Sequence, residues 1–387
     1  MTSTETSKWT GETLTAGDSR IEVSELIGSG AQGAVYALSG DADRVVKIFN
    51  RERRGNKRAK IRAMIENDPS HGRIVWPQAI VEHGTNDEFL GYTMSRIDLD
   101  SAANAFEYSM TEMDWDSSDS EQRSSVCQNL AVMVNAIHRE GHAIGDFNHD
   151  NILIDEQQQV SLIDCDGFHI TDGSATYPDD TYYPRYAPPE GRGGDELSNV
   201  READRFSLGV HIFQMLMEGF HPYHAQGTNA VDGSMEDKLK GNKFPYVDYA
   251  GFDPIDRAPS IAEYERLPEE VQDLFRRCFT ESGKNQSEGV VLGHTSPDRP
   301  EPEEWIGALP VPDPVPYQQP TLHETGVDVV TPDSGSKPAA KTDGSLSPVQ
   351  PESRDSAPEE SGGLEPVAPG QDEPPASDDE SPDMTDD

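Results

Sequence analysis

Apolar residues in the first quarter of the chain occur in short runs rich in β-branched side chains, which is the pattern of strands. Five such runs, bounded by glycine, asparagine, aspartate or proline, lie at residues 21–27, 34–38, 44–49, 74–76 and 90–94. A stretch rich in lysine and arginine, residues 51–66, predicts one helix among them, ended by Asn67, Asp68 and Pro69. We therefore expect a small β-rich lobe over about residues 20–95.

Beyond Arg96 the spacing of the apolar residues becomes helical. One helix face is predicted by residues three and four apart, namely Val126, Leu130, Met133, Val134 and Ile137. Residues 206–217 are apolar almost all round, which predicts a helix buried on every side. The expected fold class is α+β: bilobal, with a small β-rich N-lobe and a larger α-helical C-lobe over about residues 98–310.

The two ends of the chain differ from this central part. Residues 1–19 are polar without a period, which predicts a flexible leader. Residues 311–387 hold 14 of the chain's 29 prolines and 18 acidic against 3 basic residues. Their few apolar side chains cannot offset the entropy of ordering, so we expect an acidic, proline-rich, disordered tail. One domain, residues 20–310, is left to carry the chemistry.

The charge excludes two classes of partner. The chain has 31 basic and 72 acidic residues, a net charge of −41, so it repels nucleic-acid phosphates and anionic lipids. Mean hydropathy is −0.71, and no apolar run approaches the ~20 residues that span a bilayer. No basic segment followed by an apolar one marks a secretory signal near the N-terminus. We expect a cytoplasmic protein without nucleic-acid or membrane partners.

The acidity extends beyond the tail. Residues 1–310 keep 54 acidic and 28 basic residues, a net of −26, and the whole chain has 10 lysines against 21 arginines. Such self-repulsion fades in molar salt, where the Debye length is ~3 Å. An acidic composition with few lysines resembles the proteins of salt-accumulating haloarchaea. An ordinary acidic protein from a mesophile is the alternative.

A glycine-rich turn separates the first two predicted strands. Gly28, Gly30, Gly33 and Val35 fit the pattern GxGxxGxV, and glycines there let backbone amides close over phosphate groups. Alone, the pattern fits a plain hairpin turn equally well. A dinucleotide-binding fold requires a helix directly after the glycines, whereas a strand is predicted here.

The residues downstream of this turn carry a resemblance to a known family. Lys47 lies in the apolar strand Val45–Ile48 after the glycine turn, like the ATP-binding lysine of protein kinases. Residues 145–154, GDFNHDNILI, resemble the kinase catalytic loop, with Asp146 five positions before Asn151. Asp164, in the run VSLIDCDG, is similar to the aspartate of the kinase magnesium motif.

Further motifs extend the resemblance to eukaryotic-type protein kinases over about residues 21–309. Residues 187–190, APPE, resemble the Ala-Pro-Glu motif, and residues 204–209, DRFSLG, resemble the opening of the buried central helix. Residues 274–279, with Arg299 after them, resemble the last two helices. The runs IDCDGF and LFRRCF are more closely similar to prokaryotic kinases that are often associated with von Willebrand A or phosphatase partner proteins.

The resemblance implies a protein kinase-like fold and a set of roles. ATP would be contacted by residues of the turn, the strands and the hinge: Ile27, Gly28, Ser29, Gly30, Gly33, Val35, Lys47, Met94, Ser95 and Ile97. Asp146, with Lys47, is the expected catalytic residue, because phosphoryl transfer needs a carboxylate that orients the attacking hydroxyl. Asn151 and Asp164 are the expected Mg²⁺ ligands. Structural support is expected from Glu190, which would pair with Arg299, from Asp204, and from Glu66, which spacing favours as the helix partner of Lys47.

Departures from the family pattern leave alternatives open. Ile144 and Gly145 replace the His-Arg of the catalytic motif, Asn148 replaces a lysine near the γ-phosphate, and Cys165-Asp166 replaces Phe-Gly. We expect an ATP- and Mg²⁺-dependent kinase that phosphorylates protein substrates, most simply on serine or threonine. The alternative is a pseudokinase, a nucleotide-binding scaffold without phosphoryl transfer. A small-molecule kinase would seldom keep Glu190, Asp204 and Arg299 together.

Overall fold

A computed structural model of the chain describes residues 8–84, 86–97, 101–112, 118–179, 183–189, 197–224, 244–246, 261–280 and 299–309. All of these residues belong to one compact unit, residues 1–322, and a second unit covers residues 323–387. The acidic tail expected over residues 311–387 falls outside the described residues.

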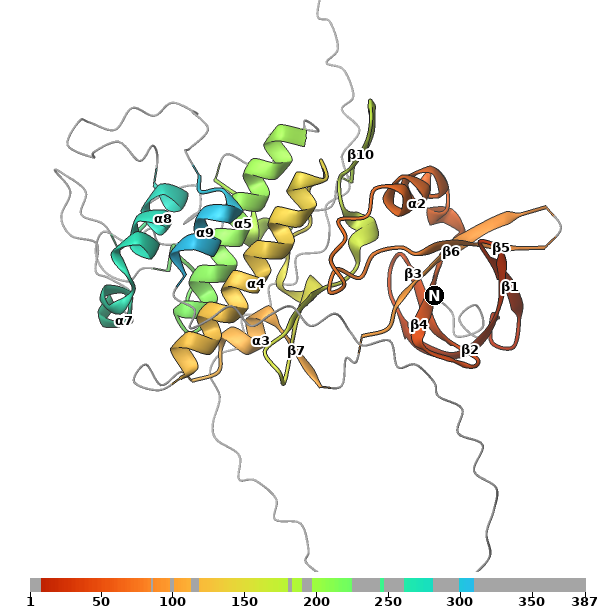
Figure 1. The fold of residues 1–387 in the computed structure, drawn as a ribbon, viewed down its shortest axis with the longest axis horizontal. Coiled ribbons are helices and arrows are strands. Elements are labelled where there is room, and N and C mark those ends of the chain that lie inside the picture. The colour runs from red at the N-terminus through yellow and green to blue at the C-terminus, as the bar shows by residue number, and fades with distance from the viewer. Residues whose placement is uncertain are drawn as a thin grey trace, which may run out of the picture. The chain divides into compact units, whose positions relative to one another are not determined.

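The first part of the chain forms a six-stranded antiparallel sheet in the order β1-β2-β3-β4-β6-β5 (Figure 1). Its strands are β1 (Thr13–Ala16), β2 (Ser19–Ser29), β3 (Gly33–Leu38), β4 (Asp41–Phe49), β5 (Ala79–His83) and β6 (Glu88–Ser95). Thr15 and Ala16 of β1 also pair with β5, which closes the sheet on itself. Apolar side chains fill its interior, among them Leu14, Val46 and Leu90.

Strand β1 corrects the expectation of a flexible leader over residues 1–19 for its described part, residues 8–19. Leu14 and Ala16 are buried and alternate with two threonines, and Trp9 is buried against the ring of His83. The alternation covers only four residues, so the polar residues around it concealed the strand. Pairing with both β2 and β5 supplies the backbone hydrogen bonds that hold so short a strand.

Two other expected elements differ in the structure. Residues 74–76 form a single bridge, between Ile74 and Leu162, and no strand; Trp76 instead donates its indole N–H to the carbonyl of Met64 at 2.6 Å. The basic stretch 51–66 is a short 3₁₀ turn, η1 (Arg51–Arg53), followed by helix α2 (Lys57–Glu66). Gly55, between them, disfavours a continuous helix.

The second part of the chain is mainly helical. Its helices are α3 (Ala105–Ser109), α4 (Asp119–Arg139), α5 (Leu197–Leu216), α7 (Ile261–Arg266), α8 (Glu269–Phe279) and α9 (Pro302–Ala308). Helices α4 and α5 lie side by side, and α9 packs on α4 (Figure 1). The prediction of a fully buried helix over residues 206–217 is confirmed, because every apolar residue there is at most 2% exposed.

Two small antiparallel sheets carry the segments with the candidate site residues; their strands lie between α4 and α5 in the chain, except β7, which precedes α3. One holds β7 (Ala102–Asn104), β8 (Ile152–Asp155) and β9 (Val160–Leu162). The other is the hairpin of β10 (Ile170–Asp172) and β11 (Ala175–Tyr177). A single apolar cluster runs from Phe49 and Tyr92 of the large sheet to Phe213 and Trp305 in the helical part. The two parts therefore share one core, within which the site is fixed.

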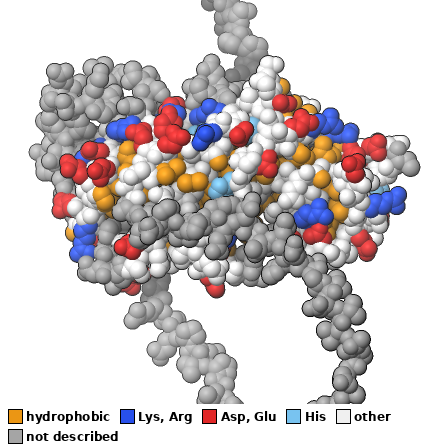
Figure 2. Space-filling view, viewed as in Figure 1, with side chains coloured by type: hydrophobic (Ala, Val, Ile, Leu, Met, Phe, Trp, Pro, Cys, Tyr) orange, Lys and Arg blue, Asp and Glu red, His pale blue; other side chains and the backbone are white. Residues whose placement is uncertain are grey.

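The surface agrees with the composition. Acidic and basic side chains are interspersed over the face seen in Figure 2, with small apolar areas between them. Among the described residues, no helix combines the length and the apolar character that a membrane crossing needs.

Candidate active site

The glycine-rich turn connects β2 and β3 and leaves its tip open. The backbone N–H of Gly30 donates to the carbonyl of Gly33 at 2.8 Å, which closes the turn. A Cβ on Gly33 would lie 2.3 Å from the carbonyl oxygen of Ile48, so only glycine lets β3 approach β4 here. At Gly28 and Gly30 nothing lies within 4 Å of the same point. The backbone of the turn thus faces open space, as a phosphate-covering loop requires.

Four residues form a row across the sheet below this turn. Val35 pairs with Gly28 on one side and with Lys47 on the other, and Lys47 pairs with Tyr92. Directly opposed residues of an antiparallel sheet point to the same face, so the side chains of Val35, Lys47 and Tyr92 share one side. On β2, Ile27 and Ser29 are exposed. The expected nucleotide contacts of β2, β3 and β4 therefore lie together.

The expected hinge follows at the end of β6. Met94 and Ser95 pair with Val45 and Arg44 of β4, and the hydroxyl of Ser95 accepts a hydrogen bond from the side chain of Gln78 at 2.9 Å. Met94, Ser95 and Ile97 are all half-buried. Their contact with an adenine ring stays a prediction.

Lys47 contacts two carboxylates from a distant part of the chain. Its side chain is 7% exposed, and its ammonium group touches Asp164 and lies 2.5 Å from Oδ1 of Asp166. Among the described residues, Glu66 is not one of the carboxylates that Lys47 contacts, which corrects the expected pair. Helix α2 begins only at Lys57 and turns Lys60, Ile61 and other residues toward the core, while Glu66 is its last residue.

Asp166 is a fully buried carboxylate with compensating partners on several sides. Besides Lys47, its Oδ1 accepts a hydrogen bond from the hydroxyl of Tyr92 at 2.8 Å. Lys57 donates to its backbone carbonyl at 3.1 Å and lies 3.5 Å from its Oδ2. Burial favours the neutral acid, but Lys47 and Lys57 outweigh it and lower the pKa of Asp166 to about 2. Asp166 is therefore ionised in the folded protein.

The catalytic-loop residues and Asp164 meet at one end of the β8–β9 hairpin. Asn151 directly precedes β8, and Asp164 lies two residues after β9. The backbone N–H of Ile163 donates to the carbonyl of Asn151 at 3.0 Å, so the two chain segments are fixed side by side. The side-chain amide of Asn151 donates to the carbonyl of Asp146 at 3.1 Å. The structure thus brings Asp146, Asn151, Asp164 and Lys47 together.

Asp204 holds the backbone of the loop before Asp146. Its carboxylate, fully buried in the first half of α5, accepts hydrogen bonds from the N–H groups of Ile144 at 2.7 Å and Gly145 at 2.8 Å. The ring of His138 in α4 lies 3.0 Å from the same carboxylate. These bonds satisfy backbone donors that would otherwise be buried without a partner, and they set the direction in which the chain enters Asp146.

Asn148 is turned into the loop. Its side-chain oxygen accepts a hydrogen bond from the N–H of Asp150 at 2.9 Å, and the residue is 8% exposed. In this position it caps the short turn η2 (His149–Asn151). Asn148 carries no charge, so it does not replace the cation that many kinases place at this position.

Two of the expected supporting residues lie far down the chain. Glu190 falls outside the described residues, so its pairing with Arg299 stays a prediction. The guanidinium of Arg299 donates to the carbonyl of Glu202 at 3.3 Å and lies 5.1 Å from the centre of the Phe206 ring. Arg299 is 4% exposed and packs against the start of α5.

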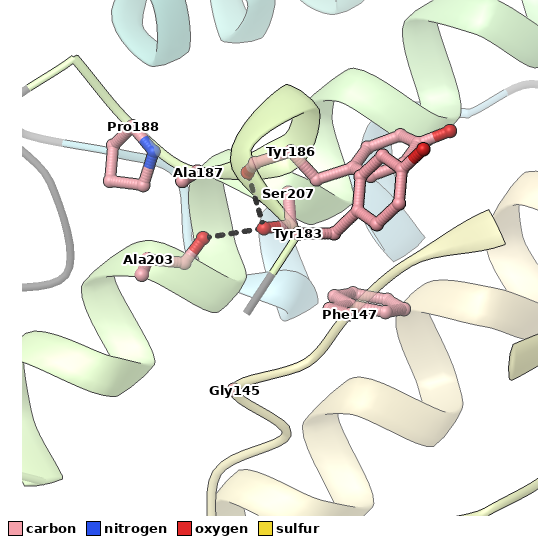
Figure 3. Close-up of a pocket in the computed structure, with 8 residues that line it drawn as sticks. All are labelled: Gly145, Phe147, Tyr183, Tyr186, Ala187, Pro188, Ala203 and Ser207. Carbon is pink, nitrogen blue, oxygen red and sulfur yellow. Dashed lines mark hydrogen bonds between the residues drawn. The ribbon is translucent and has the colours of Figure 1, made fainter. Parts of the chain in front are cut away.

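A pocket lies beside Gly145 and Phe147, the chain neighbours of Asp146 (Figure 3). The catalytic loop, the segment after the magnesium-type motif and helix α5 line it with Gly145, Phe147, Tyr183, Tyr186, Ala187, Pro188, Ala203 and Ser207. The hydroxyl of Ser207 bridges these elements, because it hydrogen-bonds the carbonyls of Tyr186 at 2.8 Å and Ala203 at 3.0 Å. The pocket walls are therefore tied to α5.

The donor set at the hairpin end fits Mg²⁺. Asn151 uses its amide N–H toward Asp146, which leaves its amide oxygen for a metal, and the Asp164 side chain is 44% exposed. Among the described residues, no group of three or more His, Cys, Asp or Glu side chains is arranged to hold a metal ion. Mg²⁺ in phosphoryl-transfer sites is commonly held by one or two protein oxygens together with substrate phosphates. Asn151 and Asp164 meet that requirement.

Sequence reasoning missed two residues of the site, Tyr92 and Lys57, and treated Asp166 only as a departure from the family pattern. Tyr92 reads as an ordinary strand aromatic, and Lys57 as one of several basic residues before a helix. An aspartate that replaces an apolar residue beside the magnesium-type aspartate was the available signal, because a carboxylate buried there needs a cation.

Comparisons with known proteins agree with this geometry. Residues 21–287 match the protein kinase domain family. The chain is 25% identical over 296 residues to "Protein kinase YegI" of Escherichia coli strain K12, covering 73% of this chain and 43% of that protein. The corresponding protein of Escherichia coli O157:H7 is 25% identical over 316 residues, or 78% of this chain and 45% of that protein. The chain spans less than half the length of these relatives.

The match covers well over half of the chain and includes the glycine turn, Lys47, Asp146, Asn151 and Asp164. Kinase activity and the use of ATP are general properties of this family. The chain belongs to the protein kinase family.

Proposed function

We propose that this domain transfers the γ-phosphoryl group of ATP, with Mg²⁺, to serine or threonine hydroxyls of protein substrates. One observation carries the proposal: Lys47, from the sheet, contacts Asp164 directly, and Asp164 lies at the same hairpin end as Asn151 and Asp146. Residues separated by more than 100 positions in the sequence thus form one cluster with the groups that phosphoryl transfer requires.

Each residue of the cluster has a distinct part in the proposed reaction. The open backbone of Gly28 and Gly30 covers the phosphates, and the buried ammonium group of Lys47 orients them. Asn151 and Asp164 offer the oxygens that would hold Mg²⁺, which neutralises the charge that develops on the phosphoryl oxygens. Asp146 orients the acceptor hydroxyl and accepts its proton.

The acceptor that we propose is a protein, and a small pocket lies beside the catalytic loop. Its walls come from the segment 183–188 and from α5, and it begins next to Gly145 and Phe147, which flank Asp146 (Figure 3). Protein substrates agree with the family, and partners of the von Willebrand A or phosphatase class remain a prediction from resemblance.

A scaffold without transfer is the second candidate, and one observation favours it. Asn148 is committed to its own loop, so the position that usually supplies a cation to the γ-phosphate contributes none. Against it, the base, the metal ligands and the lysine are all present and close together. We give priority to catalysis because all four groups keep their family positions.

The test is incubation with γ-labelled ATP and Mg²⁺ in molar KCl, followed by separation of labelled protein from labelled small molecules. We expect label in the protein itself or in added protein substrates, and none after chelation of the metal. Label confined to small metabolites would replace the proposal with a small-molecule kinase. Binding of ATP without any transfer would establish the scaffold.

A further inference from the structure

Helix α2 presents cations to the site where protein kinases usually place a glutamate. In the family, a glutamate of this helix pairs with the strand lysine. Here the only acidic residue of α2 is its last, Glu66, and the positions that face the site are Lys57 and Lys60. Lys60 is 4% exposed and lies 3.5 Å from Asp179, beyond β11. At this contact α2 therefore supplies positive charges, whereas the corresponding helix of other protein kinases supplies a negative one.

Asp166 occupies the place that the helix glutamate leaves open. It belongs to the short turn η3 (Cys165–Gly167), directly after Asp164. Its Oδ1 lies 2.5 Å from the ammonium of Lys47 and accepts from Tyr92, the strand neighbour of Lys47 in β6. Lys57 approaches the other oxygen of the carboxylate at 3.5 Å. Three side chains from three elements thus converge on one carboxylate.

The two carboxylates on Lys47 differ in burial, and this difference separates their roles. The Asp164 side chain is 44% exposed, whereas that of Asp166 is 0% exposed. Because the carboxylate of Asp164 is exposed, it can release Lys47 and bind a metal ion instead. A buried carboxylate with a hydroxyl and two ammonium groups around it cannot leave them without burying charges that have lost their partner.

We infer that Asp166 is the positioning residue for Lys47, in place of a helix glutamate, and that Lys57 of α2 stabilises Asp166 in that role. The inference rests on the proposed function, because Lys47 is positioned for the phosphates of ATP. It adds that the orientation of Lys47 depends on Asp166, which lies in the same segment as the candidate metal ligand Asp164. Helix α2 then influences Lys47 indirectly, through the contact of the Lys57 ammonium group with Asp166.

The test compares Asp166→Asn, Lys57→Glu and the double variant with the wild type. Asp166→Asn keeps the shape but removes the charge, and we expect kcat to fall about 100-fold, the scale of a misplaced catalytic group, with a smaller change in ATP affinity. Lys57→Glu alone sets two carboxylates side by side and should lower kcat as well. The double variant exchanges the two groups, so that a carboxylate on α2 faces an amide at position 166, and its kcat should exceed that of Lys57→Glu at least tenfold.

Asp172→Asn is the matched control. Asp172 lies in the same segment and contacts Asn67 at the end of α2, at 3.4 Å, without touching Lys47. It should leave both kcat and ATP affinity unchanged. Calorimetric affinity for ADP with Mg²⁺, together with the melting temperature, is measured for every variant, because a merely structural role would lower the melting temperature without a rescue of kcat by the charge exchange.

Three results would overturn the inference. They are full kcat in Asp166→Asn, equal losses in Asp166→Asn and Asp172→Asn, and a double variant no more active than Lys57→Glu alone. If Asp166→Asn does not fold, the comparison of the double variant with Lys57→Glu decides. If the wild type transfers no phosphate, the proposed function fails, and ADP–Mg²⁺ affinity in the same series still shows whether Asp166 acts on Lys47: rescue of affinity in the double variant supports it, and its absence overturns it.

Discussion

The side-chain amide of Asn151 donates a hydrogen bond to the backbone carbonyl of Asp146 at 3.1 Å. This bond ties a candidate metal ligand to the backbone of the candidate base. Because the bond uses the NH₂ group, the amide oxygen of Asn151 keeps its capacity to accept or to bind a metal ion. The relationship explains why an asparagine, which offers both a donor and a metal ligand, suits this position.

Asp146→Asn should remove most phosphoryl transfer and leave ATP–Mg²⁺ affinity nearly unchanged. Of the two substrates, the side chain is expected to contact the acceptor hydroxyl and not the nucleotide, and a positioned base contributes on the order of 10²–10⁴-fold. Labelled-phosphate incorporation beside calorimetric ATP affinity checks this. Equal transfer by the variant and the wild type would remove Asp146 from the catalytic role.

Asp164→Asn should differ from Asp146→Asn by weakening Mg²⁺-dependent nucleotide binding and transfer together. The carboxylate is the charged member of the proposed metal pair, and an amide neutralises it. Calorimetry with ADP, with and without Mg²⁺, measures the effect. Unchanged Mg²⁺ dependence of binding would show that Asp164 holds no metal ion.

The sequence predicted the candidate base and metal ligands, but it did not predict which carboxylate pairs with Lys47. Asp146, Asn151 and Asp164 are fixed in spacing by one hairpin, β8–β9, so a local pattern is enough to find them. The partner of Lys47 is a long-range choice between carboxylates on different elements. Spacing pointed to Glu66, but the starting residue of α2 decides which of its side chains face the site, and helix ends are poorly marked in sequence.

The fold was predictable to a similar degree. Residues 206–217 carry apolar side chains on all sides, and their burial follows from composition alone. Strand β1 was not predicted because Leu14 and Ala16 are its only apolar residues. Its pairing with two neighbouring strands holds it in place, and the sequence does not show that pairing. Short elements depend on tertiary partners in this way.

Asp204→Asn should destabilise the fold and slow transfer without a comparable loss of ATP affinity. An amide offers one acceptor oxygen where the carboxylate serves the N–H groups of both Ile144 and Gly145. One buried donor is left unpaired, at about 1–3 kcal/mol, and the backbone before Asp146 shifts. Urea unfolding and kcat measure the two effects. A variant with wild-type stability would show that water or a neighbour replaces the lost bond.

His211→Gln should flatten the acid side of the stability profile. His211 donates its Nε2–H to the carbonyl of Phe147 at 3.0 Å, and burial, with nearby cations adding to it, lowers the pKa of His211 to about 3 although this bond opposes the shift. The unfolded chain takes up that proton near pH 6.5. Stability is therefore present above about pH 6.5 and is lost as the pH falls toward 3, at up to about 1.4 kcal/mol per pH unit.

Glutamine at position 211 can keep the hydrogen bond to Phe147 and cannot titrate. The free energy of unfolding, measured with urea at pH 7, 6, 5 and 4, should thus fall less steeply in the variant than in the wild type. Some decline remains, because burial also lowers the pKa of His221 to about 3. Parallel profiles for the two proteins would mean that His211 does not titrate differently on unfolding.

Stability and transfer should both rise from 0.1 M to 2 M KCl. Residues 1–310 carry a net charge of −26, and their mutual repulsion acts over a Debye length of ~10 Å at 0.1 M but only ~3 Å at 1 M. Exposed ion pairs such as Arg54–Glu88 weaken over the same range, but such pairs contribute only about 0–1 kcal/mol each. Relief of repulsion should therefore dominate. A chain ending at residue 310 tests the domain without the charge of the tail, and equal melting temperatures and kcat values in both salts would refute adaptation to high salt.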